Sequence, residues 1–216
     1  MIGSFRAMVV VALLAAITIT THSGAAFSQA PAGRAGQASA KAGPNPADVE
    51  FMSGMIPHHA QAVIMAGWAK SHGARSDVLA LCERTAVGQA DEIKLMQFWL
   101  REHGQPIPSA TDTKMKMKMN GMDHDMLMPG MLTDEQMAQL DKSRGSDFDR
   151  LFLEGMIGHH GGAITMVNQL LASEGAAQDD LVYKMSSDIY ADQTTEIVFM
   201  QKMLTTVPPL SSGRAP

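Results

Sequence analysis

"FMSGMIPHHAQAVIMA", residues 51–66, recurs 101 residues later as "FLEGMIGHHGGAITMV", residues 152–167. Both copies carry the pattern Met-Ile-x-His-His inside an apolar run that has the periodicity of a helix face. Adjacent histidines are difficult to bury, because each ring has polar nitrogens that need partners. The repetition therefore predicts either a core that satisfies four imidazoles or a ligand that uses them.

Each copy begins a pair of helices joined by a short loop. Proline, glycine and capping residues predict helices over about residues 46–71, 77–103, 147–173 and 179–205. The second helices also match, because "QADEIKLMQFWL" at 89–100 aligns with "QTTEIVFMQKML" at 193–204. Two copies of an antiparallel helical hairpin predict an all-α fold, a four-helix bundle built by duplication. No segment is predicted to form a strand.

The bundle domain is predicted to span residues 45–207. The two hairpins are joined by a Met-rich connection, residues 104–132, and by a short helix at about 134–142. Thr133 and Gln136 form a capping box at the start of that helix. Residues 208–216 are predicted to be a disordered tail.

The first 28 residues have the pattern of a secretory signal peptide, with Arg6, an apolar run and then small residues. The apolar run is shorter than the ~20 residues of a transmembrane helix. We therefore expect cleavage after Ala26 or Ser28, no stable membrane anchor afterwards, and a periplasmic or secreted protein. Residues 29–44, rich in Ala, Gly and Pro, are predicted to be a disordered linker.

Composition narrows the class of protein. The 216 residues are 45% hydrophobic and carry a formal net charge of -5, which provides a core but no basic surface for nucleic acid. Cys82 is the only cysteine, so an intramolecular disulfide is impossible, and we expect this residue to be a small core side chain. The 19 methionines are unusual for a domain of this size.

On a helical wheel, both histidines of each copy border the apolar stripe. His58 lies on the same side as Met55 and Met65, whereas Leu153 in the second copy replaces Met52 and breaks the symmetry. Thioethers and imidazoles are soft to borderline donors, which suit Cu(I) and, through the imidazole nitrogens, Cu(II). The candidate ligands in the repeat are Met52, Met55, His58, His59, Met65, Met96, Met156, His159, His160, Met166 and Met200.

The alternative is a core in which the histidines are simply satisfied. Methionine often fills gaps in helical cores, and one acceptor is enough for a neutral imidazole N–H. Glu92 and Glu196, or Gln89 and Gln193, are matched residues that provide such acceptors. The same groups would orient imidazoles bound to a metal, so this feature alone leaves both interpretations open.

Residues 114–131, "KMKMKMNGMDHDMLMPGM", hold a second group of methionines in a polar segment. Thioethers on a flexible chain can surround a soft cation, and Asp123 and Asp125 add oxygen donors, although three lysines oppose a cation. The alternatives are a lid that packs over the bundle or a docking surface for a partner. The candidate ligands here are Met115, Met117, Met119, Met122, His124, Met126, Met128 and Met131.

The quoted repeats, together with "QADEIKLMQFWL" and "MPGMLTDEQMAQL", resemble the family known as domain of unknown function 305. The resemblance spans most of residues 47–205. It implies a ferritin-like four-helix bundle and an exported protein that binds copper and contributes to copper tolerance. It also implies copper roles for the paired histidines and their methionines, with the Met-rich segment as an additional site.

Three functions are consistent with these features. The leading one is an exported copper-binding protein that sequesters or hands over Cu(I), and also Cu(II). Its expected protein partner is a periplasmic copper donor or a copper exporter. A ferritin-like metal oxidase is less favoured, because di-iron bundles use paired Glu-x-x-His units and the sequence has none. The third is an interaction module that binds no metal and docks a partner on its methionines. No catalytic nucleophile pattern is present in the sequence, so we expect a binding protein and not an enzyme.

Overall fold

The computed structural model describes residues 43–211 apart from Asn120. The predicted signal peptide and most of the linker, residues 1–42, lie outside the described residues, as do residues 212–216. Among the helices that the structure describes, none combines the length and apolar character needed to span a bilayer.

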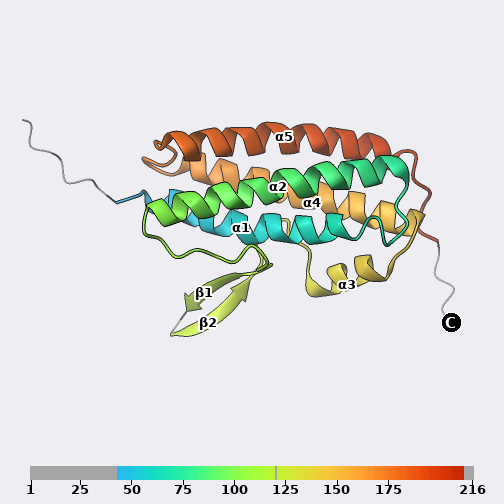
Figure 1. Ribbon diagram of the computed structural model, residues 1–216, viewed down its shortest axis with the longest axis horizontal. Helices are drawn as coiled ribbons and strands as arrows, with labels where there is room; N and C mark the ends of the chain where they lie inside the picture. The colour runs from blue at the N-terminus through green and yellow to red at the C-terminus, as the bar shows by residue number, and fades with distance from the viewer. Residues whose placement is uncertain (1–42, 120, 212–216) are drawn as a thin grey trace, which may run out of the picture. The chain divides into compact units, whose positions relative to one another are not determined.

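The predicted all-α bundle is confirmed. Helices α1 and α2 form one hairpin, α4 and α5 form the other, and α1 packs against α4 (Figure 1). Helix α1 ends about four residues earlier than predicted, and the other bounds agree closely. The elements in chain order are α1 (Pro46–Gly67), α2 (Ser76–Glu102), β1 (Met115–Met119), β2 (Met122–Met126), α3 (Asp134–Lys142), α4 (Ser146–Ala172) and α5 (Asp180–Leu204).

Local capping explains where the helices begin. The side chain of Asn45 accepts a hydrogen bond from the backbone N–H of Ala47 at 2.9 Å, at the N-terminus of α1. The predicted capping box of α3 is present, because the Thr133 hydroxyl accepts from the Gln136 N–H and the Gln136 side chain accepts from the Thr133 N–H. Helix α1 continues through Pro57.

Two buried aspartates at equivalent positions of the repeat hold the hairpins together. Asp48 of α1 accepts a hydrogen bond at 2.7 Å from the N–H of Ala177, in the loop between α4 and α5. Asp149 of α4 accepts one at 3.2 Å from the N–H of Arg75, in the loop between α1 and α2. Each hairpin therefore anchors the loop of the other through a buried carboxylate.

The prediction of no strands is wrong, because residues 115–126 form an antiparallel hairpin (Figure 1). The alternation Met-Lys-Met-Lys-Met has the period of a strand, and Asn-Gly between two such segments is a strong signal for a tight turn. Gly121 has φ +79°, the left-handed conformation that such a turn requires. The aligned pairs are Met115 with Met126, Lys116 with Asp125, Met117 with His124, Lys118 with Asp123 and Met119 with Met122.

The first part of the predicted tail lies against α4. Arg150 donates from Nε to the carbonyl oxygen of Pro208 at 2.6 Å. The N–H of Ser211 donates to Asp147 at 2.9 Å. These bonds order residues 208–211, so the described part of the segment predicted to be a tail is attached to the bundle.

Candidate metal centre

All four repeat histidines are fully buried, which goes beyond the prediction that they border the apolar stripe. His58 and His59 lie on α1, and His159 and His160 lie on α4. Because α1 packs against α4, the rings of His58 and His159 come together, with 3.8 Å between their centroids. The duplicated motif thus forms one cluster at the seam between the two hairpins.

The outer pair of histidines uses glutamates, which are one of the two acceptor pairs that the sequence left open. His59 donates from Nε2 to Glu92 on α2 at 2.6 Å, and His160 donates from Nε2 to Glu196 on α5 at 2.7 Å. Each glutamate side chain is about a quarter exposed, whereas the histidines are inaccessible to solvent. The carboxylates therefore connect the buried imidazoles to the surface between α2 and α5.

The inner pair of histidines uses backbone carbonyls instead. His58 donates from Nε2 to the carbonyl oxygen of Pro129 in the Met-rich connection at 3.0 Å. His159 donates from Nε2 to the carbonyl oxygen of His58 itself, also at 3.0 Å. A carbonyl oxygen can only accept, so the proton of both neutral rings lies on Nε2.

The Nδ1 of each of the four rings is buried and has no hydrogen-bond partner among the protein atoms. In the two inner rings this nitrogen carries no proton and is an unsatisfied acceptor. An unsatisfied buried polar atom costs roughly 1–3 kcal/mol, so four of them are expensive for a purely structural core. Histidines that bind metals have the same arrangement, in which one nitrogen donates to a carboxylate or carbonyl and the other is free to bind.

The methionines divide into two clusters that each combine both copies of the repeat. Met55 and Met65, which the sequence placed together beside His58, fall in different clusters. Among the described residues, no three His, Cys, Asp or Glu side chains are close enough to hold an ion. One cluster contains Met52, Met55, Met96 and Met166, and the other contains Met65, Met156, Met200 and Leu153.

Two glycines make room on the bundle for side chains of the connection. A Cβ on Gly54 would lie 2.9 Å from the terminal methyl of Met128, and a Cβ on Gly155 would lie 3.2 Å from a methyl of Leu132. The connection therefore packs closely on α1 and α4 at equivalent positions of the repeat. Sequence reasoning did not single out these residues, although glycine recurs at the same position of both repeats.

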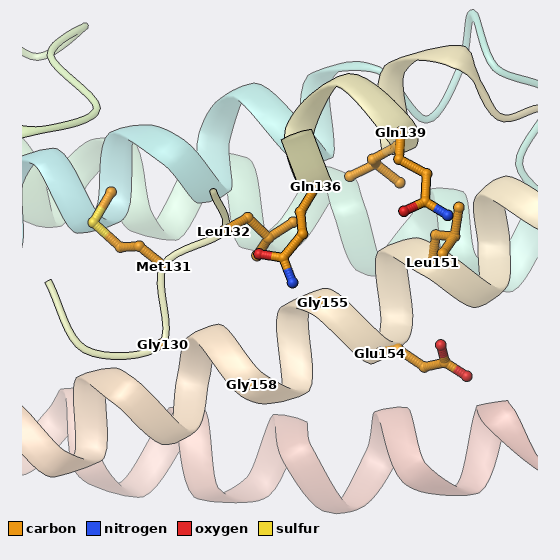
Figure 2. Close-up of a pocket in the computed structure, with 10 residues that line it drawn as sticks. Gly130, Met131, Leu132, Gln136, Gln139, Leu151, Glu154, Gly155 and Gly158 are labelled. Carbon is orange, nitrogen blue, oxygen red and sulfur yellow. The ribbon is translucent and has the colours of Figure 1, made fainter. Parts of the chain in front are cut away.

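The end of the Met-rich connection lies directly on the seam. A Cβ on Gly162 would lie 1.8 Å from the carbonyl oxygen of Pro129, so the backbone of α4 contacts the backbone of this segment. Gln61, the equivalent residue of α1, donates to the carbonyl oxygen of Leu132 and accepts from its N–H, at 2.9 and 2.8 Å. Figure 2 shows residues 130–132 crossing the glycine face of α4 above Gly158.

Five methionines of the connection and His124 lie on the β-hairpin, whereas Met128 packs against the first methionine cluster. Residues paired directly across two strands occupy the same face, so the register places the methionine and His124 positions on one face and the lysine and aspartate positions on the other. Met122 and Met126 are 62% and 40% exposed. The positions of Lys116 and Lys118 are therefore aligned with aspartate positions on the face opposite the methionines, whereas Lys114 precedes the strand and pairs with Asp134 at 2.8 Å.

Cys82 does not belong to the centre. It is buried in the second methionine cluster, as expected for a core residue, and burial raises the pKa of its thiol to about 12. Metal binding requires the thiolate, which this environment disfavours.

The family model for the domain of unknown function DUF305 matches residues 48–204. The chain belongs to the DUF305 family. The match covers both hairpins, the β-hairpin and α3, so the histidine cluster and its connection lie within the region that the family shares. No curated protein matches the sequence.

Solved structures of DUF305 proteins have the same fold. A protein from Streptomyces coelicolor, described as secreted, is 27% identical over 74% of this chain and 92% of that chain, with a TM-score of 0.62. CopM in its Cu(I)-bound form is 25% identical over 73% of this chain and 95% of that chain, with a TM-score of 0.55. CopM in its Cu(II)-bound form is 26% identical, with the same coverage and a TM-score of 0.55. Metal binding thus occurs in relatives of this chain.

Burial controls the protonation of the inner histidines in this DUF305 protein. Burial, and then the charge of neighbouring His59, lower the pKa of His58 from 6.5 to about 3. The pKa of His159 is also lowered, first by burial and then by His58. Both rings therefore remain neutral, with Nδ1 unprotonated, under mildly acidic conditions.

This shift predicts that the apo protein loses stability as the pH falls below about 6.5. Between the unfolded pKa of 6.5 and the folded pKa of about 3, the unfolded chain binds a proton at His58 that the folded chain does not. His58 alone should then lower the unfolding free energy by about 2 kcal/mol between pH 6.5 and 5. Urea unfolding at several pH values should show a shallower pH dependence for His58→Gln. His124→Gln, at an exposed site, should retain the wild-type slope.

Neighbouring glycines of α4 provide a second prediction. Gly162→Ala should destabilise the fold by about 3 kcal/mol, because the new methyl group overlaps Pro129 and displaces the connection. At Gly161 a Cβ meets nothing within 4 Å, so Gly161→Ala should be neutral or stabilising. Thermal unfolding of the two variants measures the difference. Equal melting temperatures would contradict the close packing of Pro129 on α4.

Proposed function

We propose that this protein is an exported copper-binding protein that holds Cu(I), and also Cu(II) through its imidazole nitrogens, and so contributes to copper tolerance or homeostasis. The observation that carries the proposal is the set of four buried imidazoles whose Nε2–H groups are committed to acceptors while every Nδ1 remains free. Relatives of known structure include CopM in Cu(I)-bound and Cu(II)-bound forms.

The chemistry of the donors favours copper over harder ions. Thioether sulfur and imidazole nitrogen suit Cu(I), and thioether binds without losing a proton. The depressed pKa of His58 keeps its nitrogen available in mildly acidic surroundings, where an ordinary histidine would be protonated. A buried site of this kind retains its affinity over a wider pH range than a surface site.

Binding is favoured over catalysis by the number of carboxylates. Each hairpin pairs one histidine with one glutamate, His59 with Glu92 and His160 with Glu196. Bundles that oxidise substrates at two irons need further carboxylate ligands. We infer that the protein stores copper or passes it to a partner, in the compartment to which its signal peptide directs it.

The proposal predicts that Cu(I) affinity depends on the inner histidines. Anaerobic competition titration of the chain from residue 29 onward should show at least about tenfold weaker binding for the double variant His58→Leu, His159→Leu. His103→Gln is the matched control, because this ring donates to the carbonyl of Trp99 outside the cluster. Circular dichroism checks that each variant is folded.

Cu(I) should also raise the melting temperature of the wild type, because a ligand that binds only the folded state stabilises it by about 2.7 kcal/mol at 100 times its Kd. If neither affinity nor melting temperature distinguished the wild type from the double variant, the histidine site would be excluded. An interaction module that binds no metal would then be the better interpretation.

The β-hairpin makes a separate contribution in this proposal. Replacing exposed Met122 and Met126 by leucine removes two thioethers and should lower the number of Cu(I) ions bound, with the affinity of the buried site unchanged. Met137→Leu on α3, a methionine outside both candidate sets, is the control. An unchanged stoichiometry would show that the hairpin does not bind copper.

A further inference from the structure

A pocket opens where the start of α1 lies beside the end of α4, at one end of the seam between the hairpins (Figure 1). Its volume is about 320 Å³. Met128 of the connection and Met166 of α4 line it. Glu50, Gln169 and Ser173, which are wholly or partly exposed, also line it and form its mouth. The pocket therefore gives solvent a route to two thioethers.

The two thioethers meet beside Gly54 of α1. A Cβ at this glycine would lie 2.9 Å from the terminal methyl of Met128 and 3.4 Å from that of Met166. Met166 belongs to the first methionine cluster, and Met128 packs against that cluster. Both side chains therefore converge on one point between the pocket and the core.

This pair of sulfurs is close to the inner histidines. Gly54 precedes His58 by four residues, or roughly 6 Å along the axis of α1. Met128 is followed directly by Pro129, whose carbonyl oxygen accepts a hydrogen bond from Nε2 of His58. The route from the pocket to a buried imidazole is thus about one helical turn long.

The equivalent place in the other half of the seam is filled by aromatic rings. The centroid of the His72 ring lies 5.8 Å from that of Trp68 and 5.1 Å from that of Phe148. These rings occupy the positions at which the pocket has smaller residues. At the repeat offset of 101, Phe148 corresponds to Ala47, Trp68 to Gln169 and His72 to Ser173.

The other half also has leucine in place of the second thioether. A Cβ on Gly155 would lie 3.2 Å from a methyl of Leu132 and 3.5 Å from the terminal methyl of Met65, which is fully buried. The pocket on that side, about 280 Å³ between α3 and α4, is lined by Met131 (Figure 2). The sulfur of Met131 already accepts from the N–H of Met128 at 3.2 Å. The described residues thus place a pair of sulfurs at an opening in the first half of the seam.

We propose that the pocket lined by Met128 and Met166 is the port through which Cu(I) reaches and leaves the histidine cluster. This role rests on the proposed copper function. Cu(I) passes by exchange of ligands, from the thioethers to the imidazole nitrogens, and its oxidation state does not change. Because each step leaves the ion with donor atoms, no bare charge enters the core, where it would be costly.

The rates of Cu(I) exchange test the port. Stopped-flow absorbance of the chain from residue 29 onward, without oxygen, measures release to excess bathocuproine disulfonate and uptake from its Cu(I) complex. Gln169→Trp fills the mouth with the residue found at the equivalent position of the other half, and both rates should fall at least about tenfold. A blocked port raises the barrier equally in both directions, so the Kd should stay within about twofold of the wild-type value.

Two comparisons control for indirect effects. Asn168→Trp is the matched control, because Asn168 is exposed on α4 beside Gln169 but does not line the pocket. Met128→Leu removes one thioether of the port and should also slow both rates, whereas Met137→Leu should not. Thermal unfolding checks that each variant is folded.

Wild-type exchange rates in Gln169→Trp would overturn the port, and so would equal slowing by Asn168→Trp. A weaker affinity with an unchanged uptake rate would overturn it as well, since the residue would then act on the bound ion. The Cu(I) affinity of the wild type is measured separately at equilibrium. A protein that binds Cu(I) but admits it elsewhere is therefore distinguished from a protein that binds no Cu(I), which would overturn both the port and the copper function.

Discussion

Burying four imidazoles requires an acceptor for each ring N–H, and the bundle is arranged to provide them. The second helices provide Glu92 and Glu196 to the outer rings. The inner rings take carbonyls from the connection and from the opposite copy of the repeat. Because a lost acceptor would leave a buried donor unsatisfied, the positions of α2, α5 and the connection are all tied to the histidines. The carbonyl acceptors also fix the tautomer of the two inner rings, whose Nδ1 atoms remain without a partner.

The two halves of this cluster are unequal for a topological reason. A duplicated pair of hairpins approaches twofold symmetry, but only one connection joins them, and it crosses the seam. One side of that crossing has Gly162, which gives room for the backbone of Pro129, and the other has Gln61, which binds the backbone of Leu132. The sequence indicated asymmetry through Met52 and its counterpart Leu153. The structure adds a larger difference, since only His58 contacts the connection.

Much of the fold could be predicted from sequence because the repeat is long and its periodicity is clear. Helix ends followed from local signals, and matched positions limited the imidazole partners to Glu92 and Glu196 or Gln89 and Gln193. The strict alternation around Asn120-Gly121 also predicts the β-hairpin. This signal was missed because the methionines were interpreted as ligands on a flexible chain. The grouping of methionines could not be predicted, because it depends on how α1 and α4 pack against each other, which a helical wheel does not contain.

The outer histidines connect the buried cluster to the surface of the bundle. Glu92 and Glu196 accept from the Nε2–H groups of His59 and His160, and each carboxylate is about a quarter exposed. A carboxylate that accepts strongly from Nε2–H makes the opposite nitrogen a better donor to a metal. The metal affinity of a buried nitrogen would therefore depend on a carboxylate that solvent reaches, as well as on the packing of the core.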